Sequence, residues 1–227
     1  MTPVLAQATR PPLEWDWVLD NGGRLWDATY EHLVLTGISV AIGLVVALGL
    51  AVLALRWPRT YGPILSVSGV LYTIPSLAAF AVLVPFFGFS RTTAVIALVT
   101  YTLLILAKNI VDGIRGVPDE VVEAARGMGY RPVRLFLTIQ LPLALPVIVA
   151  GVRVATVTVI GLVTVTALLG LDSLGQLILS GFRSLPIFPT LIVMGTLLSV
   201  VLALVLDLLL LALERLLTPW ARRRTTV

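Results

Sequence analysis

The sequence predicts an all-α polytopic membrane protein with five transmembrane helices. Apolar residues make up 58% of the 227-residue chain and charged residues only 12%, whereas globular chains carry about 45–50% and about 25%. The apolar residues gather in runs with few charges, each long enough to cross a hydrocarbon core of about 30 Å at about 1.5 Å per helical residue. The five runs are residues 33–55, 61–87, 93–111, 146–169 and 187–213. The absence of cysteine excludes disulfides and thiol chemistry.

Residues 1–32 precede the first run, and we expect them to form an external N-terminal extension. They lack the basic start and the apolar core of a secretory signal. We therefore expect a mature segment, with a short interfacial helix around residues 24–31.

Basic residues set the expected orientation of the transmembrane region, residues 33–214. They follow the first run, occupy the central loop and end the chain in a basic tail, residues 215–227: Arg56, Arg59, Arg115, Arg126, Arg131, Arg134, Arg215, Arg222, Arg223 and Arg224. Positive charge marks the cytoplasmic side of membrane proteins. All three groups share that side if the second run crosses the membrane once, but not if it splits at Pro75 into two crossings. The sequence thus predicts an external N-terminus and a cytoplasmic C-terminus.

The central loop, residues 112–142, is polar and carries helical signals of its own. Pro118 suits the first position of a helix, and the acids after it suit the positive end of the helix dipole. Four residues at i, i+3, i+4 and i+7 form one apolar stripe: Val121, Ala124, Ala125 and Met128. Gly127 and Gly129 then supply a turn before a second short helix over residues 132–140. We expect this segment to be too short to form its own core and to dock in a groove of another protein.

The same loop carries a family resemblance. Glu123-Ala124-Ala125, then Gly127 and Gly129, then Gln140-Leu141-Pro142, resembles the EAA loop of permease subunits of bacterial ABC importers. Blocks at residues 72–77, 113–116, 141–153 and 206–219 are similar to the osmoprotectant branch of that family. The resemblance covers roughly residues 15–219, and residues 168–175 depart from it where relatives carry a Gly-rich segment.

The resemblance implies the fold of methionine-importer permeases, placed in the bacterial cytoplasmic membrane. It implies import of a compatible solute such as glycine betaine, choline or carnitine, with another small solute such as an amino acid as the alternative. The implied ATPase-coupling residues are Glu123, Ala124, Ala125, Gly127, Met128, Gly129, Leu141 and Pro142. The implied partners are two copies of an ABC ATPase, a second identical or paralogous permease, and an extracellular or periplasmic solute-binding protein. Membrane lipid surrounds the spans, and no nucleic-acid partner is expected.

No catalytic site is expected in this chain. A phosphate-binding Walker A loop needs a Gly-rich turn followed by lysine, and the single lysine, Lys108, lies in Leu-Ala-Lys-Asn-Ile. The single histidine, His32, stands at the predicted outer end of the first span and has no cysteine to activate. We therefore expect no cofactor or metal here, and assign ATP and Mg to the partner ATPase subunit. An ATP-independent channel or carrier, the rival class, would need no docking segment and often shows internal repeats.

Pro75 interrupts the second span, because proline lacks the N–H that continues a helix. The break is either a packing kink or part of the solute path. If it belongs to the path, we expect the lining to include Tyr72, Thr73, Pro75, Ser76, Thr164 and Thr166. No aromatic cluster that could hold a quaternary ammonium is visible in the spans, so selectivity is expected to reside in a separate binding protein.

Ionisable residues inside apolar runs should pair or face water, because each costs about 2.5–3.5 kcal/mol at the centre of a membrane helix. Lys108 and Asp112 are spaced to form a bridge along one helix. Arg153 and Asp207 either pair between the fourth and fifth spans or extend separately to the interface.

Overall fold

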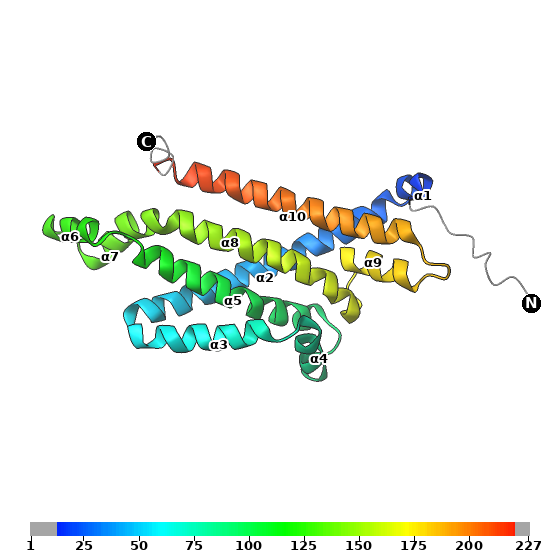
Figure 1. Cartoon of the computed structure of the whole chain (residues 1–227), viewed down its shortest axis with the longest axis horizontal. Helices are drawn as coiled ribbons and strands as arrows, with labels where there is room; N and C mark the ends of the chain where they lie inside the picture. The colour runs from blue at the N-terminus through cyan, green and yellow to red at the C-terminus, as the bar shows by residue number, and fades with distance from the viewer. Residues whose placement is uncertain (1–12, 221–227) are drawn as a thin grey trace, which may run out of the picture. The chain divides into compact units, whose positions relative to one another are not determined.

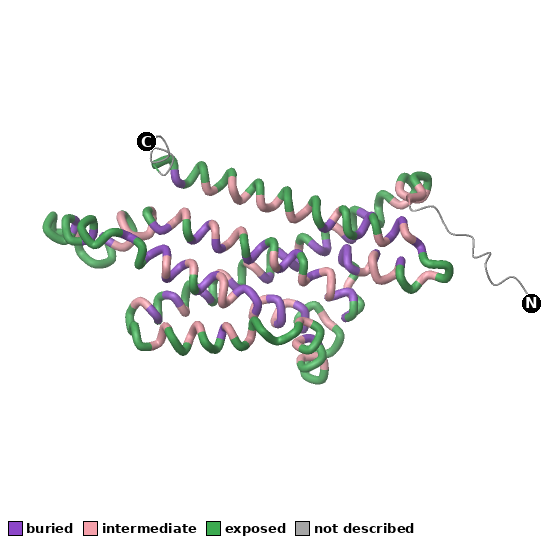
Figure 2. The backbone as a smooth tube through the Cα atoms, in the orientation of Figure 1, coloured by how far each residue is buried: buried purple, intermediate pink, exposed green. Residues whose placement is uncertain are grey.

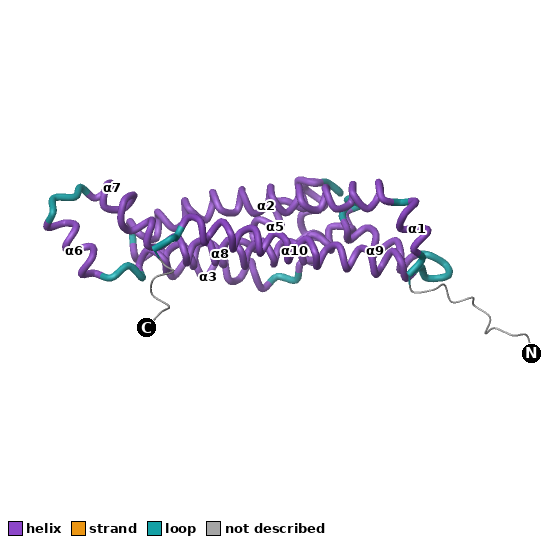
Figure 3. Tube along the Cα trace, turned by 90° about the horizontal axis from the view of Figure 1, so that it is seen from above, coloured by secondary structure: helices purple, strands orange, loops and turns teal. Residues whose placement is uncertain are grey.

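The computed structural model describes residues 13–220, and these residues form helices joined by short turns, with no strand among them (Figures 1 and 3). In chain order the elements are α1 (Trp15–Asp20), α2 (Gly22–Arg56), η1 (Pro58–Thr60), α3 (Tyr61–Thr73), α4 (Ser76–Phe87), α5 (Arg91–Arg115), α6 (Asp119–Gly127), α7 (Pro132–Leu135), η2 (Phe136–Gln140), α8 (Leu141–Val163), η3 (Thr164–Leu169), α9 (Leu174–Arg183) and α10 (Pro189–Leu217). The predicted basic tail beyond Trp220 and the first 12 residues lie outside the described part.

The predicted spans correspond to four helices that are long and apolar enough to cross a membrane, and a fifth if α3 and α4 form one bent span. Two boundaries differ from the prediction. The helix of the fourth span runs without a break over Pro132–Leu169, 38 residues, rather than beginning near residue 146. A five-residue π-turn, η2, precedes Pro142, where the missing proline N–H interrupts the regular hydrogen-bond ladder.

The first long helix also begins earlier than predicted. Residues 24–31 are the opening turns of α2 rather than a separate interfacial helix, and the short helix α1 precedes them. His32 lies within this long helix. Its side chain is fully buried, and its Nε2–H donates to the carbonyl of Ile160 at 3.0 Å.

The described chain divides into two compact units. The first unit comprises residues up to Ile38, Ser76–Leu98 and Val159–Leu204. One of its cores joins the start of α2 to α9 and α10 through buried Leu25, Ala28, Leu174, Leu177, Phe188, Leu191 and Met194. Helices α9 and α10 lie side by side (Figure 1), and glycine makes their close approach possible. A Cβ atom at Gly181 would lie 2.6 Å from Ile192 Cγ1, and one at Gly195 would lie 2.8 Å from Ile178 Cγ1.

A second core of the first unit joins α4, α5 and η3 through Phe80, Ala94, Ala97 and Leu169. Gly170, with φ of +75°, ends η3 in the left-handed conformation that glycine adopts without strain. The chain then turns back so tightly that a Cβ atom at Gly175 would lie 1.9 Å from the Thr164 carbonyl oxygen. This hairpin therefore requires glycine at position 175.

The second unit comprises Ser39–Pro75, Val99–Thr158 and the chain from Val205 onward. Small residues of α2 face α5 and α8 in its core, which contains Ala47, Ala51, Ala54, Leu106, Ala107, Ile110, Val111, Ile114, Ala144, Ile148 and Ala155. Two glycines bring these helices together. A Cβ atom at Gly43 would lie 2.0 Å from Thr102 Oγ1, and one at Gly151 would lie 2.5 Å from Asn109 Cβ. Close packing through small residues is the usual basis of helix association in membranes.

Gly151→Leu is expected to destabilise the second unit by about 1–3 kcal/mol, the usual cost of overpacking a well-packed core. The added side chain meets Asn109 on α5 and cannot be accommodated without shifting α8. Gly161→Leu, in the same helix, is the matched control because no atom lies within 4 Å of a Cβ atom there. Thermal unfolding of both variants in detergent measures the effect. Equal melting temperatures for the two variants would contradict this account of α5–α8 packing.

Helices α6 and α7 belong to the second unit and project beyond the neighbouring ends of α5 and α8 (Figures 1 and 3). Contrary to the prediction, this segment has a small core of its own. Val117, Val122, Ala125 and Leu135 are buried together, with Tyr130 and Ile139 packed against them. Gly129, with φ of +82°, forms the turn between the two helices. The predicted stripe thus divides, because Ala125 faces this core and Val121 does not.

Candidate functional site

The projecting segment leaves a row of apolar side chains uncovered. On α6 and its C-cap these are Val121, Ala124 and Met128, three residues at i, i+3 and i+7 that follow one face of the helix. On α7 and η2, Val133 and Leu137 are also exposed, and Met128 and Val133 are 68% and 71% exposed. Figure 2 shows the same end of the chain as largely exposed. We call these five residues the coupling surface.

Charged residues are interspersed with the coupling surface along the chain. Asp119, Glu120 and Glu123 are exposed on α6, and Arg126, Arg131 and Arg134 follow them. Arg134 lies over the ring of Tyr130 at 4.9 Å. Exposed apolar side chains that gather in one segment are typical of a protein interaction site. Val133 and Leu137 were not predicted, although their i, i+4 spacing in the sequence indicates a shared helix face.

The remaining predicted coupling residues have structural roles in this chain. Ala125 is fully buried, and Gly127 and Gly129 end α6 and form its turn. Leu141 packs against the core between α2, α5 and α8, and the half-buried Pro142 follows it at the start of α8. Glu123, Ala124 and Met128 are exposed on the segment, as are the two glycines.

Three of the predicted path residues lie at the break after α3. Tyr72 and Thr73 end the helix, and Pro75 follows, all of them exposed. The Thr73 hydroxyl donates to the Val70 carbonyl at 2.8 Å. Ile74, the residue after the helix, presents its carbonyl to the Tyr101 hydroxyl, which donates to it at 2.6 Å.

Tyr101 also contacts the ring of Tyr72, with ring centroids 6.1 Å apart and ring planes at 69°. These two rings form an aromatic contact that the sequence did not predict. Tyr101 was missed because 27 positions separate Ile74 from Tyr101 along the chain, and no local pattern links residues that only tertiary packing brings together.

The other predicted path residues belong to the first unit. Ser76 is the first residue of α4. The Thr164 hydroxyl donates to Gly161, and Thr164 lines an apolar cavity of about 270 Å³ with Leu168, Ile178 and Phe182 among its other walls. Thr166 is fully buried, and its hydroxyl donates to the Val163 carbonyl at 2.7 Å. Its place is inside the hairpin core, so its hydroxyl does not face an open path.

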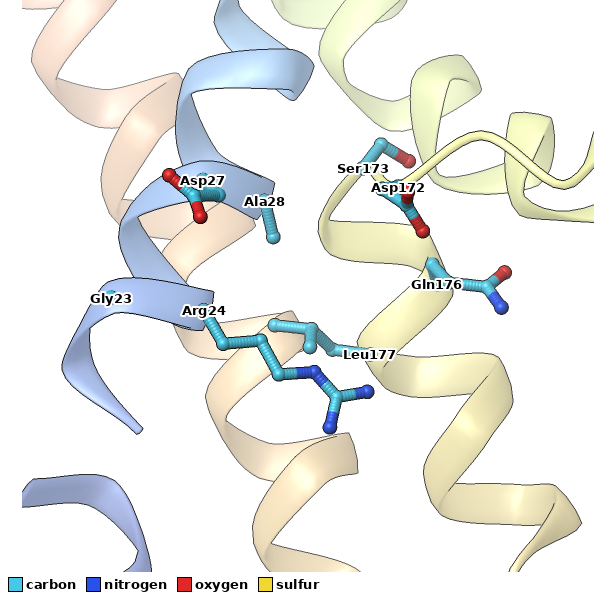
Figure 4. A pocket seen from close by; sticks show the side chains of 8 residues that line it. All are labelled: Gly23, Arg24, Asp27, Ala28, Asp172, Ser173, Gln176 and Leu177. Carbon is cyan, nitrogen blue, oxygen red and sulfur yellow. The ribbon is translucent and has the colours of Figure 1, made fainter. Parts of the chain in front are cut away.

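Two polar cavities adjoin the start of α2 in the first unit. The larger, about 430 Å³, lies between α2 and α9 (Figure 4) and is lined by Gly23, Arg24, Asp27, Ala28, Asp172, Ser173, Gln176 and Leu177. The smaller, about 360 Å³, shares Asp27 and Asp172 with it and adds the ion pair between Glu31 and Arg91. Asp172 belongs to the stretch that departs from the family pattern. Among residues 13–220, no group of three or more histidine or acidic side chains is placed to hold a metal ion.

The ion pair predicted between the fourth and fifth spans is confirmed. Arg153 of α8 donates two parallel hydrogen bonds to Asp207 of α10, from Nε to Oδ1 and from Nη2 to Oδ2, both 2.9 Å. Its Nη1 also reaches Glu214 Oε2 at 3.4 Å. The predicted bridge between Lys108 and Asp112 is present as well, and Tyr61 donates a hydrogen bond to the same carboxylate at 2.8 Å.

Comparison with known proteins identifies the class. Residues 35–219 match the family described as "Binding-protein-dependent transport system inner membrane component", and the chain belongs to this family. It is a permease subunit of a bacterial ABC importer, located in the inner membrane. The ATPase and the solute-binding protein of such a system are partner subunits, so this chain is not itself an enzyme.

Several curated permeases are similar to this chain over most of its length. The chain is 36% identical to the choline transport system permease protein OpuBB of Bacillus subtilis, over 90% of this chain and 93% of the relative. It is also 36% identical, with the same coverage, to the carnitine transport permease protein OpuCB of Listeria monocytogenes. The chain is 35% identical to the osmoprotectant import permease protein OsmW of Salmonella typhimurium, over 89% of this chain and 96% of the relative.

Two solved structures share the fold. An inward-facing form of the MetNI methionine ABC transporter superposes with a TM-score of 0.74 at 21% identity, covering 88% of this chain and 98% of that chain. An amino acid ABC transporter with histidines superposes with a TM-score of 0.76 at 18% identity, covering 89% of this chain and 98% of that chain. The predicted permease fold of the methionine-importer type is thereby confirmed.

Proposed function

We propose that this permease imports small osmoprotectants that carry a quaternary ammonium group, with choline, glycine betaine and carnitine as candidate substrates. The observation that carries this proposal is the near full-length similarity to permeases named for these compounds, at 33–36% identity. All three compounds share a trimethylammonium head. Another small solute, such as an amino acid, is the alternative.

The coupling surface is proposed to seat in a groove of the partner ATPase. Five apolar side chains are held outward by a segment that has its own small core, an arrangement that suits a rigid helix presented to a groove. Because one permease chain offers one such surface, we propose an assembly of two permeases and two ATPase subunits. The second permease is either a copy of this chain or a paralogue.

In the proposed cycle, the spans alternate between outward-open and inward-open arrangements. The permease orientation expected from its basic residues places α6 and α7 in the cytoplasm, where the ATPase binds ATP and Mg. Closure of the ATPase dimer would draw the two coupling surfaces together and favour the outward-open state, since a partner that binds one state more tightly shifts the population toward it. The binding protein then delivers solute from outside.

Reconstitution of the permease with its ATPase and binding protein in proteoliposomes tests the proposal. We expect uptake of radiolabelled choline, glycine betaine or carnitine that requires both ATP and the binding protein. Uptake of an amino acid alone would favour the alternative solute. Uptake that is unchanged when the ATPase is omitted would contradict the proposed coupling.

A further inference from the structure

The break after α3 presents one aromatic ring outward with a second ring behind it. Tyr72 is 39% exposed, whereas Tyr101 is only 4% exposed. The two rings meet edge to face, with centroids 6.1 Å apart, a favoured aromatic geometry. The inner ring therefore limits the orientations open to the outer ring.

Tyr101 is itself held at both ends. Its ring packs against Tyr72, and its hydroxyl donates to the Ile74 carbonyl at 2.6 Å. That carbonyl belongs to the residue after the end of α3 and precedes Pro75. An unpaired carbonyl at such a break is costly in a membrane, where the surroundings offer few donors. One hydrogen bond thus stabilises the break and fixes the ring that supports Tyr72.

The position of Tyr72 in its span is unusual for an exposed tyrosine. Tyrosines of interfacial belts lie at the ends of spans, but Tyr72 lies midway along the apolar run 61–87, beside the exposed Thr73 and Pro75. This run contains no acidic or basic residue. A cation that moves along this run therefore meets no counter-charge from it. The tyrosines of the run are Tyr61 and Tyr72.

We propose that Tyr72, oriented by Tyr101, binds the quaternary ammonium head of the solute during its passage through the permease. The face of an aromatic ring attracts a trimethylammonium group, which is bulky and weakly hydrated, without requiring a buried carboxylate. Such contacts change affinity by about 2- to 30-fold, which suits a transit site that must also release its ligand. In this assignment Tyr72 contacts the solute, and Tyr101 is a positioning residue. The inference rests on the proposed solute class.

The test measures choline imported per ATP hydrolysed by the full complex of permease, ATPase and binding protein in proteoliposomes. A merely structural defect lowers import and hydrolysis together, whereas loss of a solute contact lowers their ratio. Tyr72→Leu is expected to reduce the ratio by about 2- to 30-fold, and Tyr72→Phe to keep it. Tyr101→Phe retains the ring but removes the hydrogen bond to Ile74, and should reduce the ratio by about 2- to 10-fold. Phe86→Leu, at an exposed aromatic residue of α4, is the control and should leave it unchanged.

Phenylalanine bearing one, two or three ring fluorines at position 72 provides a second measurement that does not depend on Tyr72→Leu folding. Fluorine withdraws electron density from the ring face, so each added fluorine should lower the ratio further. A ratio that stays constant across the fluorinated series overturns the assignment of Tyr72, as does a normal ratio in Tyr72→Leu. If the unmodified complex imports none of choline, glycine betaine and carnitine, the proposed function fails instead.

Discussion

Ala124→Arg combined with Met128→Asp is expected to abolish stimulation of the partner ATPase while the permease remains folded and inserted. Both residues are exposed on the same face of α6 and neither belongs to the small core of the segment. If the coupling surface seats in the ATPase as proposed, two charges on it disrupt apolar contacts, and loss of a hot-spot contact in an interface costs about 2 kcal/mol or more. We therefore expect stimulated ATP hydrolysis to fall by at least about 30-fold.

Two further variants separate docking from folding. Ala125→Arg places a charge inside the core of the segment, where Ala125 is fully buried, so it should lower the melting temperature as well as ATPase stimulation. Arg59→Glu changes an exposed charge in η1, outside the segment, and should affect neither. Normal ATPase stimulation in the double variant, together with normal assembly, would show that the coupling surface does not contact the ATPase.

On α6, the sequence does not show which apolar residues are buried and which are exposed. The apolar residues of this helix fit two overlapping faces, one with Val121, Ala124 and Met128 and one with Val122 and Ala125. Helical spacing alone does not decide which face is buried. Contact with Val117 and Leu135 decides it, and Leu135 lies on a different helix. The sequence could therefore locate the segment and three of its outward residues, but it placed the buried Ala125 on the same face.

The spans themselves were predictable, because a helix that crosses the hydrocarbon core of a membrane needs a continuous stretch of apolar residues. Such a stretch is visible directly in the sequence. The first and last residues of the helices were less predictable. The sequence predicted separate short helices at residues 24–31 and 132–140, yet both segments are incorporated in long helices. Hydropathy measures preference for the membrane, whereas helix length also depends on packing outside it. Tyr101 illustrates the remaining gap, since its role depends on the carbonyl of Ile74, which lies 27 positions away at the end of α3.

The pairing of Arg153 with Asp207 was accessible from sequence because charged residues in apolar spans are few and each needs a partner. The surroundings of this ion pair make it important for holding α10 against α8. From residue 205 to residue 217, every residue of α10 is exposed or half-buried (Figure 2). In this stretch no fully buried apolar side chain secures α10, so the two hydrogen bonds from Arg153 are a main link between α8 and α10.

Asp207→Arg or Arg153→Asp alone is accordingly expected to lower the melting temperature and the uptake activity of the permease, because a charge without a partner is unfavourable within a membrane helix. Each single variant leaves two like charges facing each other in place of the bidentate pair. Thermal unfolding in detergent and ATP-dependent uptake in proteoliposomes measure the loss. Glu214→Gln should cost much less, because Arg153 keeps both bonds to Asp207.

The double swap, Arg153→Asp with Asp207→Arg, should recover most of the lost stability and uptake. It is best made together with Glu214→Gln, because an unchanged Glu214 carboxylate would lie near the new Asp at position 153. Rescue requires that the two positions interact directly, since independent charges that each extend to the interface gain nothing from being exchanged. If the swap is no better than the worse single variant, the α8–α10 ion pair does not hold these helices together in the membrane.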